Sequence, residues 1–360
     1  FSLNSSEYKY LFHLLLYYLM VFAIKLKWNI CNQPFNKKED KMQKKIALEE
    51  HFMHPDFVDY WANTKINISP ELFGKVRNKL EDFGEGRLSA MDSIGIEKSV
   101  LSLAGPGVQA EYFTDIAVRK SKFLNDYLAE KILGNEKRYG AFAHLALQDP
   151  CAAADELERT IRDLRFSGAL INGTTNGAYL DDDRFSVLWE RAADLDVPIY
   201  IHPNNPADVP AMYQGHSEMW GPVWSWTVET GSHALRILFS GVFDRYPNAK
   251  LILGHMGETL PYQLWRFDSR WEISNRGSKS LKMLPSEYFK KNFWCTTAGV
   301  CSDEPLRCAI DALGIERVMF SVDYPFERPE ETGKWIDGAH LSASERSMIC
   351  FENAKSLLRL

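Results

Sequence analysis

The chain has 360 residues, 45% of them hydrophobic and 25% charged, so it is long enough to bury a sizeable core in one large domain or two smaller ones. Its formal net charge is -6 and its Lys and Arg residues do not cluster, which argues against a nucleic-acid partner. The six cysteines form no CxxC pair and are too sparse for a disulfide scaffold, which favours a reduced, cytoplasmic setting.

The first 41 residues do not show the pattern of a folded domain. An apolar run covers residues 10–24, but it is short for a membrane span, and basic residues rather than a small-residue cleavage site follow it. The chain starts at Phe1, and Met42 stands just before the first regular pattern. We therefore expect residues 1–41 to be a leader or extension, with a membrane anchor as the alternative, and residues 42–360 to form a single domain.

From Lys45 onward, short runs rich in Val, Ile, Leu and Ala alternate with stretches of helical periodicity. The expected strands are residues 45–50, 98–104, 139–145, 167–173, 197–203, 249–255, 293–298 and 317–325. The expected helices are residues 115–133, 151–164, 184–196, 229–246 and 304–314. Eight hydrophobic strands that alternate with helices predict an α/β fold, a parallel (β/α)8 TIM barrel. A doubly wound open sheet is the alternative, but no GxGxxG motif follows the first strand.

Two connections are long, residues 52–97 after the first strand and residues 204–228 after the fifth. Long loops in a compact domain are usually functional. The second loop contains Trp220, Trp224 and Trp226, which would cover a pocket or pack against another subunit. We therefore expect a homodimer or homotetramer.

Acidic and imidazole side chains stand at the ends of four expected strands. Glu49 and His51 end the first strand, His202 the fifth, His255 the sixth and Asp323 the eighth. A parallel barrel places these ends around one mouth, and buried charges there are costly unless they are paired or bound to a metal. We interpret Glu49, His51, His202 and Asp323 as the ligands of one divalent ion. A mixed set of oxygen and nitrogen ligands suits Zn, Mn and Fe and does not distinguish among them.

We assign His255 a different role, because the sequence "HMGE" places Glu258 three residues later, at the start of the next expected helix. A carboxylate at that position could orient the imidazole and raise its basicity. Glu258 could equally do no more than stabilise the helix N-terminus.

The barrel pattern together with "LEEHF", "YIHP", "ILGHMGETLPYQLWR" and "FSVDYPFE" resembles the metal-dependent decarboxylases of the amidohydrolase superfamily. The likeness covers residues 42–360 and is greatest to the γ-resorcylate and 2,3-dihydroxybenzoate decarboxylases. Classical hydrolases of that superfamily carry His-x-His on strand one and often a metal-bridging Lys on strand four. Here Glu49 replaces the first His and the fourth strand has no Lys, which favours a single ion, commonly Mn or Zn.

The resemblance also implies roles for residues outside the expected ligand set. It implies that Asp323 and His255 with Glu258 take part in catalysis. It further implies that Arg266, in "LPYQLWR", lies near the substrate and that Phe326, in "DYPFE", flanks it. The expected substrate is a small aromatic acid, and no membrane partner is expected.

The chemistry can also be built from the residues. Loss of CO2 from an aromatic acid leaves an electron pair on a ring carbon, so that carbon must first be protonated. A metal that holds the carboxylate and an ortho-hydroxyl would stabilise the phenolate, and Asp323 could deliver the proton. We expect reversible, non-oxidative decarboxylation of an ortho-hydroxylated benzoate. The alternatives are a single-metal hydrolase of a lactone or amide, with Asp323 as the base, and a catalytically inactive binding barrel.

Overall fold

The computed structural model describes residues 42–62, 70–206, 208–274 and 281–360. Residues Gln43–Leu360 form one compact unit. The expectations for residues 1–41, and part of the long connection after the first strand, lie outside the described residues. In the described part of the chain, no helix combines the length and apolarity that crossing a membrane requires.

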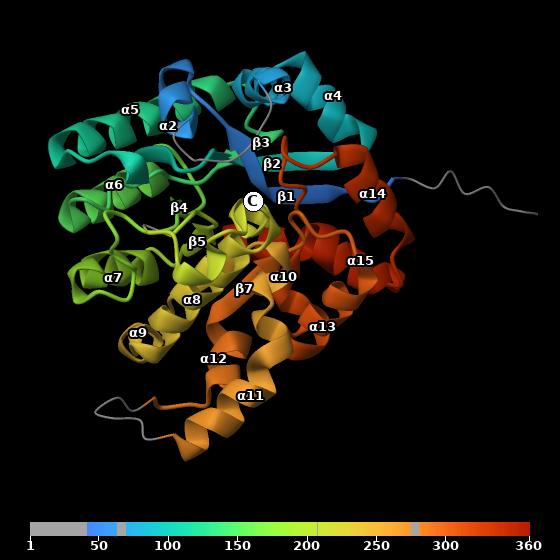
Figure 1. The fold of residues 1–360 in the computed structure, drawn as a ribbon. Helices are drawn as coiled ribbons and strands as arrows, with labels where there is room; N and C mark the ends of the chain where they lie inside the picture. The colour runs from blue at the N-terminus through green and yellow to red at the C-terminus, as the bar shows by residue number, and fades with distance from the viewer. Residues whose placement is uncertain (1–41, 63–69, 207, 275–280) are drawn as a thin grey trace, which may run out of the picture. The chain divides into compact units, whose positions relative to one another are not determined.

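In the described part of the chain, eight parallel strands and their surrounding helices form a barrel (Figure 1). The strands are β1 Lys45–Phe52, β2 Ile96–Leu103, β3 Tyr139–Ala141, β4 Ala169–Asn172, β5 Pro198–His202, β6 Lys250–Leu253, β7 Phe293–Thr296 and β8 Val318–Met319. They pair in the orders β1-β2-β3 and β4-β5-β6-β7-β8. Single parallel bridges, Ala143 with Ala169 and Glu50 with Tyr324, join these two segments at both seams. The predicted (β/α)8 barrel is confirmed.

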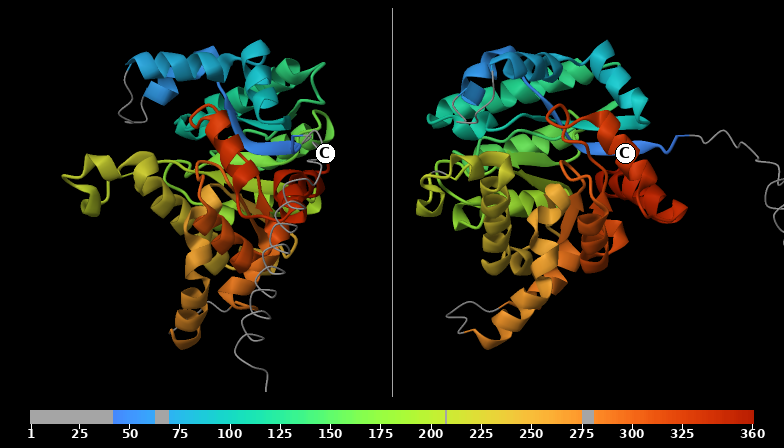
Figure 2. Two further views of the ribbon diagram at one scale, coloured as in Figure 1. Left: turned by 90° about the vertical axis from the view of Figure 1, so that its right-hand side faces the viewer. Right: turned by 45° about the vertical axis from the view of Figure 1, so that its right-hand side comes forward.

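Helices follow the strands and cover the outside of the barrel (Figure 2). They are α2 Val58–Ala62, α3 Pro70–Glu81, α4 Glu85–Ser93, α5 Thr114–Ile132, α6 Pro150–Arg162, α7 Ser186–Asp194, α8 Ser225–Phe239, α9 Val242–Arg245, α10 His255–Glu258, α11 Leu260–Ile273, α12 Pro285–Asn292, α13 Asp303–Leu313, α14 Pro329–Gly338, α15 Ala343–Ser347 and α16 Asn353–Leu358. The helix expected at residues 229–246 is divided in two, because Gly241 between α8 and α9 adopts a positive φ of 78°.

The eighth strand is much shorter than the expected 317–325. β8 ends at Met319. The next three amide groups find partners outside the barrel ladder. The N–H groups of Phe320, Ser321 and Val322 donate to Ile349 O, Thr297 Oγ1 and Glu50 Oε1. A hydrophobic run does not reveal such partners, so the sequence overestimates the strand.

A β-bulge in β1 lies directly before the polar end of that strand. The register with β2 shifts between Ala47 and Glu50. The Ser321 hydroxyl oxygen accepts hydrogen bonds from the backbone N–H groups of Leu48 and Glu49, with N to Oγ distances of 3.1 Å and 2.6 Å. It therefore replaces the missing ladder partners. A bulge of this kind turns consecutive side chains toward one face. Leu48 packs in the barrel interior, and Glu49 reaches Tyr200 in the same interior.

The barrel interior is filled by one hydrophobic side-chain cluster and closed by the C-terminal helix. Interior members come from most of the strands: Ile46, Leu48, Val100, Leu170, Tyr200, Ile252 and Met319, with Phe142 just after β3. Ala354, Leu357 and Leu358 of α16 pack against this cluster. A second, larger cluster lies between the strands and the outer helices. This packing holds the strand ends, and therefore the polar residues on them, on a rigid frame.

Residues 208–224, between β5 and α8, carry only three short 3-10 turns. Figure 2 shows this segment standing out from the barrel, and it shows α11 extending away from the strands. The long connection expected after the fifth strand is therefore present. Its expected end is residue 228, but α8 already begins at Ser225, so the connection is shorter than expected.

Candidate metal and catalytic site

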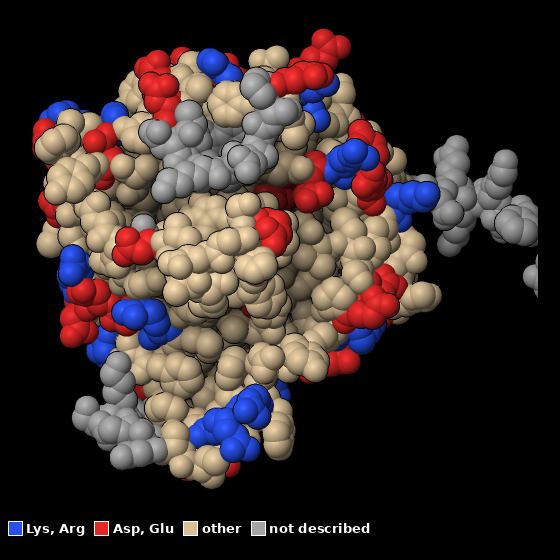
Figure 3. All heavy atoms as spheres, viewed as in Figure 1, with Lys and Arg blue, Asp and Glu red and all other residues tan. Residues whose placement is uncertain are grey.

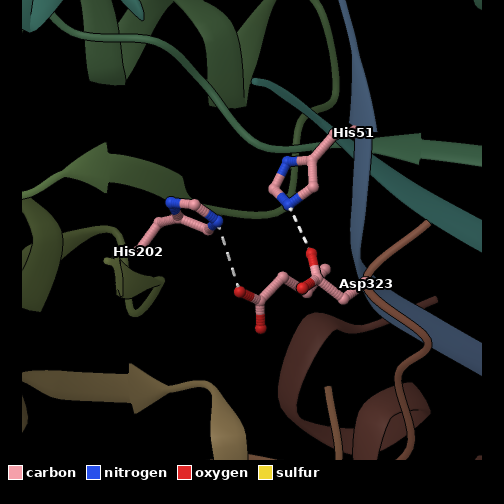
Figure 4. A group of neighbouring side chains, drawn as sticks. His51, His202 and Asp323 are labelled. Atoms are coloured by element: carbon pink, nitrogen blue, oxygen red, sulfur yellow. Dashed lines mark hydrogen bonds and ion pairs between the residues drawn. The ribbon is translucent and has the colours of Figure 1, made fainter. Parts of the chain in front are cut away.

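Four of the expected side chains meet at the mouth of the barrel. One ligand atom each from Glu49, His51, His202 and Asp323 lies within 4.8 Å of the other three. His51 Nε2 is 3.1 Å from Asp323 Oδ1, and His202 Nε2 is 3.5 Å from Glu49 Oε1 (Figure 4). The Asp323 side chain is 14% exposed, and the other three residues are buried. β1, β5 and the segment after β8 thus contribute to one small polar space.

Both histidines of this cluster turn Nε2 toward its centre. His202 Nδ1 lies 2.8 Å from the carbonyl oxygen of Pro203, and because a carbonyl only accepts, Nδ1 carries the proton. Burial lowers the pKa of His202 to about 3, so the ring is neutral and Nε2 keeps its lone pair. His51 Nδ1 lies 3.1 Å from the Ser102 hydroxyl, which is compatible with the same tautomer. Such outer contacts on Nδ1 are typical of metal-binding histidines.

The two carboxylate oxygens of Glu49 have different surroundings. Oε2 accepts hydrogen bonds from the Tyr200 hydroxyl and, at 3.4 Å, from Thr296 Oγ1. Oε1 is buried and has no hydrogen-bond donor among the described residues. Burial raises the pKa of Glu49 to about 7, an effect that the positive charge of His255 partly opposes. A buried oxygen with no donor, beside the Nε2 atoms of two imidazole rings, fits a bound cation.

His255 and Glu258 lie on a left-handed turn rather than at the start of a normal helix. The φ angles are 47° at His255, 56° at Met256, 79° at Gly257, 53° at Glu258 and 64° at Thr259. The expectation that Glu258 begins the next helix is therefore wrong, since α11 begins at Leu260. Positive φ is unfavourable for residues other than Gly, and strained backbone of this kind is enriched at functional sites.

The side chains on this turn form a chain of contacts toward the cluster. His255 Nδ1 is 2.7 Å from Glu258 Oε1, and Glu258 is only 1% exposed. On the other side of the ring, His255 Nε2 lies 3.8 Å from Asp323 Oδ2 and 3.9 Å from Glu49 Oε1. His255 therefore stands beside the four-residue cluster with its outer nitrogen held by a carboxylate.

The charges at the site favour a protonated imidazole beside an ionised carboxylate. Burial lowers the pKa of His255, but the negative charges of Glu258 and Glu49 outweigh it, so this pKa lies well above its ordinary value. Burial raises the pKa of Asp323, but interactions with His255 and His51 outweigh it, so this pKa lies below its usual range. A proton is therefore held on His255, next to an acceptor oxygen of Asp323.

The two residues expected near the substrate differ in position. The Phe326 ring lies 5.6 Å from the His51 ring and is 38% exposed, so it borders the cluster. Arg266 lies on α11 with its side chain exposed. Among the described residues, no contact joins Arg266 to the cluster. The structure therefore brings Phe326 to the site but does not bring Arg266 to it within one chain.

Several residues that support the site are not among those predicted from the sequence. Tyr200 stands two residues before His202, so strand alternation could have placed both side chains on the interior face. Arg87 on α4 is buried, donates to the His51 carbonyl oxygen at 2.6 Å, and stacks 4.8 Å above the Tyr324 ring. Nothing in the local sequence around Arg87 indicates this role, because its partners come from distant strands.

A family model described as amidohydrolase matches residues 66–360. The chain belongs to the amidohydrolase family. This amidohydrolase-family chain is 40% identical over 329 residues to γ-resorcylate decarboxylase of Polaromonas sp. (strain JS666), covering 89% of this chain and 99% of that one. It is 35% identical to decarboxylase orsB of Emericella nidulans, covering 88% and 97% of the two chains.

Solved structures of the amidohydrolase family show the same relationship. A 2,6-dihydroxybenzoate decarboxylase in complex with 2,6-dihydroxybenzoate is 38% identical with a TM-score of 0.84, covering 89% of this chain and 100% of that one. Dihydroxybenzoic acid decarboxylase from Polaromonas sp. JS666, with bound manganese and the inhibitor 2-nitroresorcinol, is 39% identical with a TM-score of 0.83. That match covers 89% of this chain and 98% of that structure.

Proposed function

We propose that this amidohydrolase-family protein is a metal-dependent decarboxylase of ortho-hydroxylated benzoates, with 2,6-dihydroxybenzoate as the first candidate substrate and resorcinol and CO2 as its products. The observation that carries the proposal is the four-residue cluster with an ion pair of His255 and Glu258 directly beside it. The similarity to γ-resorcylate and 2,6-dihydroxybenzoate decarboxylases over nearly all of their length supports the same reaction here.

Glu49, His51, His202 and Asp323 are the residues that would hold one divalent ion, Mn or Zn. Two carboxylates and two imidazoles suit both ions, and the manganese-bound relative supports the first. When bound, the ion would supply positive charge that favours binding of the substrate carboxylate and its neighbouring hydroxyl as a phenolate.

The protein's own residues move the proton. Glu258 holds His255 Nδ1, so the proton on Nε2 faces Asp323. The distance from His255 Nε2 to Asp323 Oδ2 is 3.8 Å. Asp323 takes this proton and delivers it to the ring carbon that bears the carboxylate. The bond from that carbon to the carboxylate then breaks, its electron pair returns to the ring, and CO2 leaves. The ring is left as a phenolate, which takes back from solvent the proton that the hydroxyl lost on binding and departs as the phenol. In the reverse direction, the same groups would accept the ring proton while a phenol is carboxylated.

Phe326 is proposed to pack beside the aromatic ring of the substrate, since its own ring borders His51. Arg266 is proposed as a substrate-binding residue on its sequence motif alone, because its side chain is exposed on α11.

The proposed chemistry predicts a clear order among substrates. Benzoates with a hydroxyl beside the carboxylate, namely 2,6-dihydroxybenzoate, 2,3-dihydroxybenzoate and salicylate, should release CO2. We expect 3-hydroxybenzoate and 4-hydroxybenzoate to be inert or nearly so, because they lack that pair of neighbouring oxygens. The measurement is CO2 release by the metal-loaded protein. If all three ortho-hydroxylated acids fail while a lactone or amide is hydrolysed, the protein is a hydrolase instead.

We further propose a homodimer or homotetramer. Large apolar side chains are exposed on two parts of the described chain, Met212, Val223 and Trp224 before α8 and Tyr262 and Trp265 on α11. Exposed aromatic and Met side chains of this kind usually mark interfaces. Figure 3 shows a broad area with few charged side chains on the face viewed, with Lys, Arg, Asp and Glu mostly around it.

A cytoplasmic location and a single catalytic domain at residues 42–360 complete the proposal. Among the described cysteines none is in a disulfide, which supports a reducing compartment. The compact unit Gln43–Leu360 contains the whole family match, which supports a catalytic role without residues 1–41.

A further inference from the structure

The Glu258 carboxylate has a second partner that neither the motif nor the proposed mechanism includes. The hydroxyl of Thr227, at the start of α8, donates to Glu258 Oε2 at 2.7 Å. Glu258 Oε1 is held at the same distance by His255 Nδ1. Each oxygen of this buried carboxylate therefore has one side-chain partner, and Thr227, Glu258 and His255 form a line that ends at Asp323.

The Thr227 hydroxyl decides how the carboxylate is oriented. The last torsion of a Glu side chain is soft, so a carboxylate turns easily unless both of its oxygens are held. Without the hydroxyl, Oε2 of Glu258 would be a buried acceptor with no donor, which is energetically costly. The carboxylate would therefore turn toward another donor. Such a turn would move Oε1 away from His255.

The backbone around Glu258 cannot compensate for a lost side-chain contact. Residues 255–259 all have positive φ, which leaves the turn few alternative conformations. Helix α8 also packs closely on this turn, because a Cβ added at Gly231 would lie 3.4 Å from the Glu258 carbonyl oxygen. The position of His255 therefore depends on side-chain contacts within a rigid frame.

We propose that Thr227 is a positioning residue for the reaction: its hydroxyl fixes the Glu258 carboxylate and, through it, the His255 ring toward Asp323. This inference rests on the proposed decarboxylation for its kinetic test, whereas its structural test is independent of the reaction.

The kinetic test compares two substitutions with opposite expectations. Thr227→Val keeps the shape but removes the hydroxyl, and kcat for CO2 release from 2,6-dihydroxybenzoate should fall about 10-fold to 100-fold, with KM and metal content nearly unchanged. Thr227→Ser keeps the hydroxyl, and its kcat should stay within about threefold of the original. Thr230→Val is the matched control, since Thr230 is buried on the same helix and has no described hydrogen bond to Glu258. Its kcat should not change.

A double substitution separates positioning from a general packing defect. Because Thr227 acts through Glu258, adding Thr227→Val to Glu258→Gln should lower kcat much less than it does in the original protein. An equal loss in both backgrounds would overturn the proposal, and so would an unchanged kcat in Thr227→Val.

Crystal structures of the variants supply the test that needs no activity. In Thr227→Val, the distance from Glu258 Oε1 to His255 Nδ1 should exceed hydrogen-bond range, whereas Thr227→Ser should keep it. A Thr227→Val structure with this contact intact would refute the positioning role. If no benzoate loses CO2 at all, the proposed function fails, and these structures still decide the role of Thr227.

Discussion

Replacing Asp323 with Asn should lower kcat for CO2 release by about 10²-fold to 10⁴-fold, the usual contribution of a positioned acid or base. KM for 2,6-dihydroxybenzoate should change only a few-fold. The reason is that Asn nearly matches the shape of Asp but cannot take up and deliver a proton. Steady-state kinetics on the metal-loaded protein measures both quantities, and a drop in kcat and kcat/KM together marks an interaction made in the transition state.

The surroundings of Asp323 make this substitution informative. Oδ1 faces His51 and Oδ2 faces His255, so the two oxygens belong to the cluster and to the proton path respectively. Asp311→Asn, on the exposed surface of α13, is a control that should leave kcat unchanged. Metal analysis of both variants is needed, because loss of the ion would also abolish turnover. An Asp323→Asn protein that keeps its metal and its full kcat would contradict the assigned role.

Replacing His255 with Asn should lower kcat by a similar factor, about 10²-fold to 10⁴-fold, while the metal content stays close to that of the original protein. The reason is that His255 stands beside the four-residue cluster, and its Nδ1 is held by Glu258. Without the imidazole, no group at this position carries the proton to Asp323. Metal analysis and CO2 release on the same preparation measure the two effects.

The control for this variant is His340→Asn, because His340 is exposed and pairs only with Asp303 among its described ion-pair partners. It should change neither quantity. If His255→Asn loses metal in proportion to its activity, His255 belongs to the ligand set, and the separation of binding from proton transfer is wrong.

The cluster could be predicted because its acidic and imidazole residues directly follow hydrophobic runs in the sequence. Glu49, His51, His202 and Asp323 each follow residues that read as a buried strand, and a parallel barrel places such ends together. The pairing of Glu49 and His51 on one face also agrees with strand alternation. What the alternation did not reveal is the bulge before them, because the Ser321 hydroxyl that supports it lies far away in the sequence.

The conformation around His255 could not have been predicted from the residues. The sequence "HMGET" contains one glycine, yet all five residues adopt positive φ. Local preferences oppose this conformation at the other four, so tertiary contacts must impose it, among them the burial of Glu258 and the packing of α8. For the same reason the partner of Glu258 on α8, Thr227, was not foreseen.

A motif match locates a residue in the chain without locating its side chain in space. The family resemblance predicts that Phe326 and Arg266 both lie near the substrate, but only Phe326 borders the cluster in the structure. Phe326 follows Asp323 by three residues and is bound to it through the backbone, with Phe326 N donating to Asp323 O at 2.8 Å. The Arg266 side chain is exposed on α11. This helix extends away from the barrel (Figure 2), so the position of Arg266 relative to the site depends on more than the local sequence.

Metal-dependent decarboxylation is tested most directly by measuring CO2 and resorcinol release from 2,6-dihydroxybenzoate in one preparation. The measurement is made before metal removal, after EDTA treatment and after reloading with Mn²⁺, with metal content determined each time. We expect about one ion per chain in the active protein, since the cluster offers one set of four ligand atoms. We also expect equal amounts of CO2 and resorcinol, no release after EDTA, recovery on reloading, and no recovery in His202→Ala. Full activity in the metal-free protein, or no CO2 release from the loaded one, would show that this protein is not a metal-dependent decarboxylase.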